Sequence, residues 1–255
     1  MRSRRPSFTA RSVALIRSRL PRPKTPEGDS DAERQLYDGL RLQFGLPLFA
    51  GRGRISIAER TAFIDEETLL AITNSIAQVV IVGAGYDGRA LRFRTPGVRF
   101  FEVDHPATQV DKRRRLDRLG VSITQVRFVP INLISARLED ALSKTDYRRE
   151  DASLFLCEGL VRYLPQPCVR RLFSDLRTLA APGSRLVLNN REYLAPIGLS
   201  RRRIFLSLLR EPICSTFTIG ETARLLNSAG WQITREVRRA VVKSERILVA
   251  AEPVR

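Results

Sequence analysis

Histidine and cysteine are scarce in this sequence of 255 residues. The one histidine, His105, follows an acid at the end of an apolar run, and we expect a hydrogen-bonded loop residue there rather than a catalytic base. The three cysteines, Cys157, Cys168 and Cys214, are odd in number and lack metal-ligand spacing. These shortages argue against a structural zinc site, and we expect no metal. Free cysteines are typical of a reducing compartment, so the expected location is the cytoplasm.

Long apolar segments are absent as well. No run approaches the ~18–20 residues that a membrane-spanning helix needs, so no transmembrane segment is predicted. Arg4 and Arg5 give the N-terminus a superficial likeness to a twin-arginine export signal. The apolar stretch that should follow such a signal is interrupted by Arg11, Arg17 and Arg19. We therefore do not expect a signal of this kind.

The N-terminal segment carries many basic residues and several prolines. Residues 9–20 allow an amphipathic helix on anionic lipid as an alternative. The prolines at 21, 23 and 26, followed by Gly28, are typical of a linker. We predict that residues 1–29 form a basic, flexible tail and linker.

The net charge is strongly positive, +17 from 44 basic and 27 acidic residues. Only Lys24, Lys112, Lys144 and Lys243 are lysines. Such a preference for arginine indicates a genome-wide bias rather than selection for phosphate contacts. No basic segment is interleaved with aromatic residues, so nucleic acid is not an expected partner. An RNA methyltransferase stays open as an alternative, since a basic surface attracts anions in general.

A glycine turn joins two apolar runs in residues 79–104. Gly83, Ala84 and Gly85 follow the first run, and the second run ends in Asp104, 21 positions after Gly83. Glycines let a ligand approach the backbone closely. An acid at the end of the next strand can accept hydrogen bonds from two ribose hydroxyls. This pattern predicts a nucleoside-bearing cofactor.

The spacing Gly83-x-Gly85-x-x-Gly88 also fits the dinucleotide fingerprint of NAD-dependent oxidoreductases. Asp87 argues against that interpretation, because its carboxylate would repel a pyrophosphate in the same loop. The chain also offers no set of residues for hydride transfer. The oxidoreductase remains a minor alternative.

Four segments resemble the leucine carboxyl methyltransferase-like family of class I S-adenosylmethionine-dependent methyltransferases. They are Arg-Thr-Ala-Phe-Ile-Asp (60–65), Gly-Ala-Gly-Tyr-Asp-Gly-Arg-Ala (83–90), Glu-Val-Asp-His-Pro (102–106) with Lys112, and Glu-Gly-Leu-Val-Arg-Tyr-Leu-Pro (158–165). They occur in the family's order and spacing, from about residue 55 to the C-terminus. The resemblance implies an S-adenosylmethionine cofactor and leaves the methyl acceptor open.

The expected fold is α/β, a Rossmann-like class I methyltransferase fold. The resemblance implies a mostly parallel seven-stranded sheet with one antiparallel strand. We expect strands at 79–82, 98–103, 126–131, 152–157, 184–189, 231–237 and 246–251. The methyltransferase domain would span residues 30–255, with an N-terminal helical lid over 30–75. An inserted segment at about 194–217 would form part of the acceptor pocket or a homodimer contact.

The resemblance assigns cofactor contacts to particular residues. The backbone of Gly83, Ala84 and Gly85 would pass under the methionine part, and Asp104 would bind the ribose. Arg60 could clamp the methionine carboxylate through its planar guanidinium. Glu158 would meet the methionine ammonium or, alternatively, begin a helix.

Two acids and one amide near these positions have open or altered roles. Glu102 would share the ribose or form an inward ion pair, and Asp87 would cap the next helix or approach the ammonium. Asn132 and Leu133 stand where the family usually has Asp-Leu, whose acid binds the adenine amine. An asparagine oxygen can still accept from that amine, without the charge assistance worth roughly 1 kcal/mol.

Tyr163, Arg191 and Tyr193 are expected to border the acceptor, and Arg191 would suit an acidic one. The predicted activity is methylation, most simply of an oxygen in a carboxylate or hydroxyl of a small molecule. A carboxylate acceptor is already ionised, so no catalytic residue is assigned. A cofactor-binding relic without catalysis is the alternative from another class of function.

Overall fold

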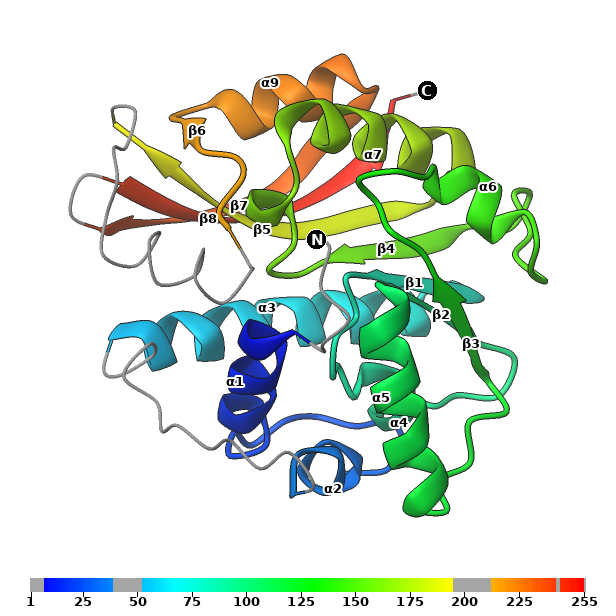
Figure 1. Ribbon diagram of the computed structural model, residues 1–255. Helices are drawn as coiled ribbons and strands as arrows, with labels where there is room; N and C mark the ends of the chain where they lie inside the picture. The colour runs from blue at the N-terminus through cyan, green and yellow to red at the C-terminus, as the bar shows by residue number, and fades with distance from the viewer. Residues whose placement is uncertain (1–6, 39–51, 195–211, 242–243, 255) are drawn as a thin grey trace.

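A computed structural model describes residues 7–38, 52–194, 212–241 and 244–254. One mixed sheet organises this part of the chain, with strand order β3-β2-β1-β4-β5-β8-β7 and a short β6 beside β5 (Figure 1). The order reverses direction along the chain between β1 and β4. In open α/β sheets a ligand binds outside the carboxyl ends of the strands at such a point.

The strands from β1 to β5 pair with one another in parallel. They are β1 (Gln78–Val82), β2 (Arg99–Asp104), β3 (Val126–Pro130), β4 (Ser153–Cys157) and β5 (Arg185–Tyr193). Every residue of β1 and β4 is buried, because helices cover both faces of the centre of the sheet. The short apolar runs in the sequence are the signature of such doubly covered strands.

The C-terminal strands complete the sheet in the expected way. β7 (Trp231–Val241) and β8 (Ser244–Pro253) form an antiparallel hairpin, and β8 also lies antiparallel to β5. The single reversed strand of a class I methyltransferase fold is therefore confirmed. β6 (Phe217–Thr218), parallel to the end of β5, was not predicted.

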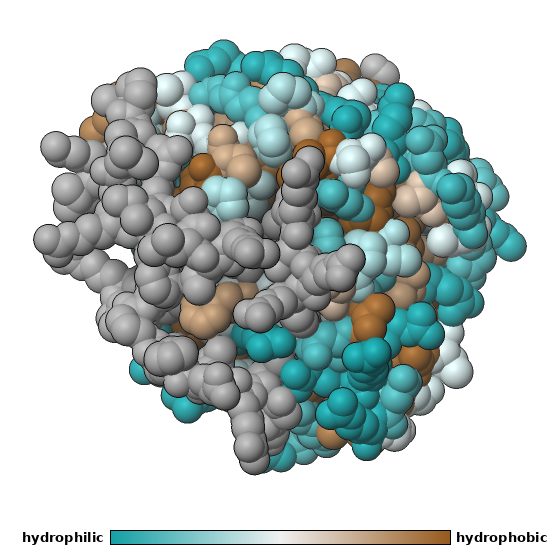
Figure 2. Space-filling view, viewed as in Figure 1, coloured by the Kyte–Doolittle hydropathy of each residue, from teal (hydrophilic) through white to brown (hydrophobic). Residues whose placement is uncertain are grey.

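Helices form a layer on each face of the sheet. α6 (Leu138–Leu142), α7 (Gln166–Leu179) and α9 (Glu221–Ser228) lie on one face, and α3 (Arg52–Thr73), α4 (Arg89–Arg92) and α5 (Pro106–Arg118) lie on the other (Figure 1). Each layer buries its own apolar cluster against the sheet. The described part of the surface is mainly hydrophilic on the face shown in Figure 2. Among the described helices, none is long and apolar enough to cross a bilayer.

The N-terminal segment differs from the flexible tail that we expected at residues 1–29. From Ser7, which caps its first turn, the chain forms helix α1 (Phe8–Arg17). Ile16 on this helix is buried against Ile57 of α3. An amphipathic helix does form here, but its apolar residues pack on the protein rather than on lipid. The many basic residues of this segment had instead favoured the prediction of a solvated tail.

Arg22 anchors the linker between α1 and α2 (Ala32–Asp38). Its guanidinium donates two hydrogen bonds of 2.7 Å to the two carboxylate oxygens of Asp65 on α3, and a further one to Glu33 on α2. Its side chain is only 2% exposed. Burial lowers the pKa of Arg22 to about 10 in spite of these partners. The linker, α2 and the more distant α3 are thereby joined by one buried cation.

Removal of this cation tests whether the N-terminal segment is docked. Arg22→Ala should lower the free energy of unfolding by about 3–5 kcal/mol, because it leaves buried carboxylates without a partner. Urea denaturation measures the loss. Arg34→Ala is the control, since its pair with Asp31 is 62% and 53% exposed, and should cost about 0–1 kcal/mol. Equal losses in the two variants would contradict the docked arrangement.

Asp65 makes the stability depend on pH. Burial alone would raise its pKa, but Arg89 and Arg22 outweigh burial and lower it. Since the folded-state pKa lies below the unfolded value, this stabilisation is present above about pH 4 and is lost as the pH falls further. The stability difference between the wild-type protein and Asp65→Asn should therefore be largest at neutral pH and shrink in acid. Urea denaturation at a series of pH values checks this, and a difference independent of pH would refute it.

Candidate functional site

One cavity of about 860 Å³ lies at the carboxyl ends of the parallel strands. Its lining comes from the ends of β1 and β2 and the residues that follow β1 and β4, from residues within β5, β7 and β8, and from α1 and the first turns of α3. Cavities of about 300–1,000 Å³ are typical of small-molecule sites. The expected lid over residues 30–75 therefore contributes only through α3, while α1 supplies the other part of the wall; residues 39–51 lie outside the described ranges.

The glycine turn gives this cavity an open backbone floor. Gly83 and Gly85 have φ values of 73° and 51°, which L-amino acids with side chains rarely adopt. A Cβ on Gly83 would come within 3.1 Å of Leu160, and one on Gly85 within 3.0 Å of Ala10 on α1. Gly83, Ala84 and Gly85 all line the cavity, and their contact with a cofactor stays a prediction.

Asp104 is brought directly beside the glycine turn. Its two carboxylate oxygens accept hydrogen bonds of 2.5 Å from the backbone N–H groups of Gly85 and His105. Those donors fix the orientation of the carboxylate at the end of β2, where it lines the cavity. His105 is the N-cap of α5, and its Nδ1 accepts from the backbone N–H of Ala107 at 3.3 Å, which fits the expected loop role.

The sequence left two roles open for Glu102, a ribose contact or an inward ion pair, and the structure shows the ion pair. Both of its carboxylate oxygens accept from Lys112 Nζ, at 2.7 and 2.6 Å, and both side chains are 1% exposed. Burial raises the pKa of Glu102 against the opposing effect of Lys112. Glu102 does not line the cavity, so this pair supports the fold behind Asp104.

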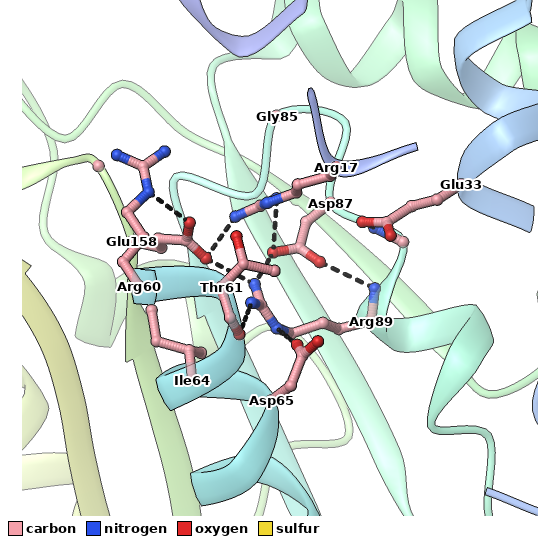
Figure 3. Close-up of polar contacts among 12 residues, drawn as sticks. Arg17, Glu33, Arg60, Thr61, Ile64, Asp65, Gly85, Asp87, Arg89 and Glu158 are labelled. Atoms are coloured by element: carbon pink, nitrogen blue, oxygen red, sulfur yellow. Dashed lines mark hydrogen bonds and ion pairs between the residues drawn. The ribbon is translucent and has the colours of Figure 1, made fainter. Parts of the chain in front are cut away.

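Glu158 lies under three guanidinium groups at the end of β4 (Figure 3). Its Oε1 is 2.8 Å from Arg60 Nε, its Oε2 is 2.7 Å from Arg89 NH1, and Arg17 also contacts Oε2. Burial would raise the pKa of Glu158, but Arg17, Arg89 and Arg60 hold it well below its usual range. The carboxylate is therefore ionised and oriented, and it lines the cavity.

Arg17 was not foreseen as a site residue. It projects from the last turn of α1 into the cavity, where it also approaches Asp87 at 3.3 Å. Burial opposes its charge, but Glu158 and Asp87 outweigh burial and raise the pKa of Arg17. No short motif marks this residue in a chain with so many arginines, and only the packing of α1 identifies it.

Asp87 and Glu33 occupy the beginning of α4, where a dinucleotide would place its pyrophosphate. Asp87 accepts from the backbone N–H of Arg89 at 2.8 Å and from the Arg89 guanidinium at 2.5 Å. Glu33 accepts from the N–H of Gly88 at 3.1 Å, and a Cβ on Gly88 would collide with it. Two carboxylates at this helix start disfavour an anionic ligand there, which weakens the oxidoreductase alternative.

Arg60 is the most accessible cation around Glu158. Its side chain is 16% exposed, and its terminal nitrogens lie near Gly159 at the cavity wall. Among the described residues, only its Nε has a hydrogen-bond partner, the carboxylate of Glu158. The remaining N–H groups of Arg60 are thus available to an anionic ligand, in keeping with the predicted clamp.

Asn132 and Leu133 follow β3 at the same edge of the sheet but do not line the cavity. The side-chain oxygen of Asn132 accepts from the backbone N–H of Ile134 at 3.1 Å. An amide oxygen has a second lone pair, and the Asn132 amide nitrogen has no protein partner among the described residues. Their role at the adenine stays a prediction.

One end of the cavity lies over β5 and β8. Tyr163 and Arg191 line it, whereas Tyr193 does not, and the Tyr193 hydroxyl accepts a hydrogen bond of 3.4 Å from Arg162. Their role at the acceptor stays a prediction. Arg162 and Arg246 also line this end, and sequence reasoning missed both. The inserted segment expected at about 194–217 falls largely outside the described residues, apart from its end, which pairs with Arg162 through backbone hydrogen bonds.

Comparison with known proteins identifies the family of this chain. The leucine carboxyl methyltransferase family matches residues 49–177, about half of the chain. An S-adenosyl-L-methionine-dependent methyltransferase of Mycolicibacterium smegmatis is 30% identical over 254 residues, covering 89% of this chain and 83% of the relative. A similarly named protein of Mycobacterium avium is 32% identical over 202 residues, covering 74% and 65%. One from Parafrankia sp. is 34% identical, but the match covers 54% of this chain and 45% of the relative.

Solved structures agree on the fold. The N-terminal domain of EvdMO1, solved in the presence of SAH and D-fucose, superposes with a TM-score of 0.51 at 13% identity, covering 74% of this chain and 82% of that domain. Magnesium protoporphyrin IX methyltransferase from Synechocystis, with bound SAH, gives 0.51 at 15% identity, covering 87% and 93%. The motifs, the sheet order and these matches lead to one conclusion: the chain belongs to the leucine carboxyl methyltransferase family of S-adenosylmethionine-dependent methyltransferases.

Proposed function

We propose that this methyltransferase transfers its methyl group to an oxygen, in a carboxylate or hydroxyl of a small molecule. The observation that carries the proposal is the continuity of the cavity. A single space of about 860 Å³ connects Asp104 and the glycine turn with Tyr163 and Arg191. That volume, near the upper end for small-molecule sites, has room for a cofactor and a small acceptor side by side.

The residues present fit S-adenosylmethionine. The side-chain-free floor at Gly83 and Gly85 would pass under the methionine part, and the oriented carboxylate of Asp104 would accept from the ribose hydroxyls. The free N–H groups of Arg60 would hold the methionine carboxylate. Glu158 would receive the ammonium, with Asn132 and Leu133 near the adenine.

Arg17 would compete with the ammonium of the cofactor for Glu158. It contacts the same carboxylate oxygen as Arg89, on the cavity side. An ammonium that pairs with Glu158 would have to share the carboxylate with Arg17 or shift it. Cofactor binding and the docking of α1 are therefore linked through one carboxylate.

The chemistry needs orientation more than proton transfer. Bound S-adenosylmethionine would supply a methyl group already activated by the sulfonium. The protein's own contribution is to hold the acceptor oxygen in line with that methyl group, and such orientation supplies ~7–11 kcal/mol of barrier reduction. A carboxylate acceptor arrives ionised, so no general base is required. A hydroxyl acceptor would need one, and among the cavity residues Asp104 and Glu158 are already engaged by hydrogen bonds or ion pairs.

Turnover tests the proposal against the relic and the oxidoreductase. Purified protein with S-adenosylmethionine and a panel of carboxylic acids and alcohols should release S-adenosylhomocysteine with at least one acceptor. S-adenosylhomocysteine should raise the melting temperature, and NAD should not. Methylation confined to nitrogen acceptors would contradict the O-directed assignment, and a thermal response to NAD alone would contradict the cofactor.

Substitution of Asp104 should weaken binding of the cofactor more selectively than substitution of the other site residues. Asp104→Asn keeps the shape but removes the charge from two hydrogen bonds to the ribose, each worth about 1.5–3 kcal/mol when charged. We expect at least tenfold weaker binding of S-adenosylhomocysteine by titration calorimetry. Asp146→Asn, in an exposed pair with Arg127, is the matched control. Unchanged affinity in Asp104→Asn would remove Asp104 from the ribose site.

A further inference from the structure

Three arginines lie at the end of the cavity over β5 and β8. They are Arg162 before α7, Arg191 on β5 and Arg246 on β8, and all three line the cavity. We propose that this arginine cluster binds an anionic group of the acceptor, a carboxylate or phosphate, that is separate from the oxygen to be methylated. The inference rests on the proposed function and adds to it the class of acceptor.

The sheet register forces two members of the cluster together. Arg191 and Arg246 are directly opposite each other in the antiparallel β5–β8 ladder. Like charges at directly opposite positions destabilise a sheet. An anion that lies between or above the two guanidinium groups would relieve this repulsion.

Few acids of the protein are available to supply that anion. Arg246 NH1 lies 3.1 Å from Glu59, which also approaches Arg239 at 4.0 Å. The two acids adjacent in the strands, Glu192 and Glu245, instead pair with Arg238, at 3.1 and 2.8 Å. Neither of these acids lines the cavity, so Glu59 is the sole acid of the described lining at this end.

The donors of the cluster are also incompletely used. The Nε atoms of Arg162 and Arg246 are buried and have no hydrogen-bond partner among the described residues. Arg162 otherwise donates to the hydroxyl of Tyr193, at a long 3.4 Å. Burial first, and then the charges of Arg162 and Arg246, lower the pKa of Arg191, partly offset by Tyr193. A buried donor without a partner destabilises the folded protein, and a bound anion would supply the missing acceptor.

The cofactor end of the same cavity shows the contrast. There Arg17 and Arg60 face Glu158 and Asp87, so each cation is matched by acids of the protein. Guanidinium groups pair bidentately with carboxylate and phosphate groups. A cluster of three arginines with a single acid beside it is therefore suited to an anion brought by the ligand.

The bound anion and the methyl-accepting atom must be different groups. An oxygen whose lone pairs receive several guanidinium hydrogen bonds has little electron density left for attack on a methyl carbon. The cluster would instead hold one end of the acceptor, leaving a second oxygen to point toward the glycine turn. The methylated product would then keep its anionic group.

Binding of simple anions to the full chain saturated with S-adenosylhomocysteine tests the cluster. The probes are glutarate and phenyl phosphate, with neutral glutaramide for comparison, measured by titration calorimetry. We expect glutarate, phenyl phosphate or both to bind the wild-type protein, and glutaramide to bind at least tenfold more weakly. Arg191→Gln and Arg246→Gln should each weaken binding of the anion at least tenfold.

Arg239→Gln is the matched control, because Arg239 neighbours Arg246 on the sheet but is 62% exposed and does not line the cavity. It should bind the anions as the wild-type protein does. Binding of S-adenosylhomocysteine should stay within twofold in all variants, which shows that they fold. If the wild-type protein binds S-adenosylhomocysteine but no anion, or if Arg239→Gln weakens the anion equally, the cluster is not a binding site. If S-adenosylhomocysteine itself fails to bind, the proposed function falls instead.

Discussion

A buried network of charges holds the fold and the site together. Arg89 is fully buried at its centre, bonded to Asp65, Asp87 and Glu158. Buried charges are costly to desolvate, and they are tolerated only while each has its partners. Every element that carries one of these groups is therefore fixed relative to the others: the glycine turn, the end of β4, α3 and, through Arg17, α1 (Figure 3).

This dependence explains why the N-terminal segment belongs to the functional unit. Arg17 and Arg22 contribute the outer cations of the network, and they reach acids on α2, α3 and β4. The same Glu158 carboxylate that anchors α1 is the one expected to meet the cofactor's ammonium. If it does, docking of the N-terminal helix and occupation of the site would share a single group, and each would influence the other's free energy.

Along the cavity, the balance of charge changes from one end to the other. Near the glycine turn, cations and acids of the protein neutralise one another, and the ligand must insert itself among groups that already have partners. Over β5 and β8, strand register holds Arg191 and Arg246 together, and Glu59 pairs with Arg246. The first end suits a zwitterionic nucleoside cofactor, and the second suits an anion.

The sequence by itself determined the sheet and the glycine turn, because short apolar runs, Gly83, Gly85 and Asp104 act through local conformation and strand order. Arg60 and Glu158 were also reachable, through motif resemblance. The docking of α1 and the roles of Arg17, Arg162 and Arg246 were decided only by tertiary structure. An arginine among some forty others carries no local mark of its partner. Its function depends on which acids lie within a few ångströms after folding, and that is set by packing between segments far apart in the chain.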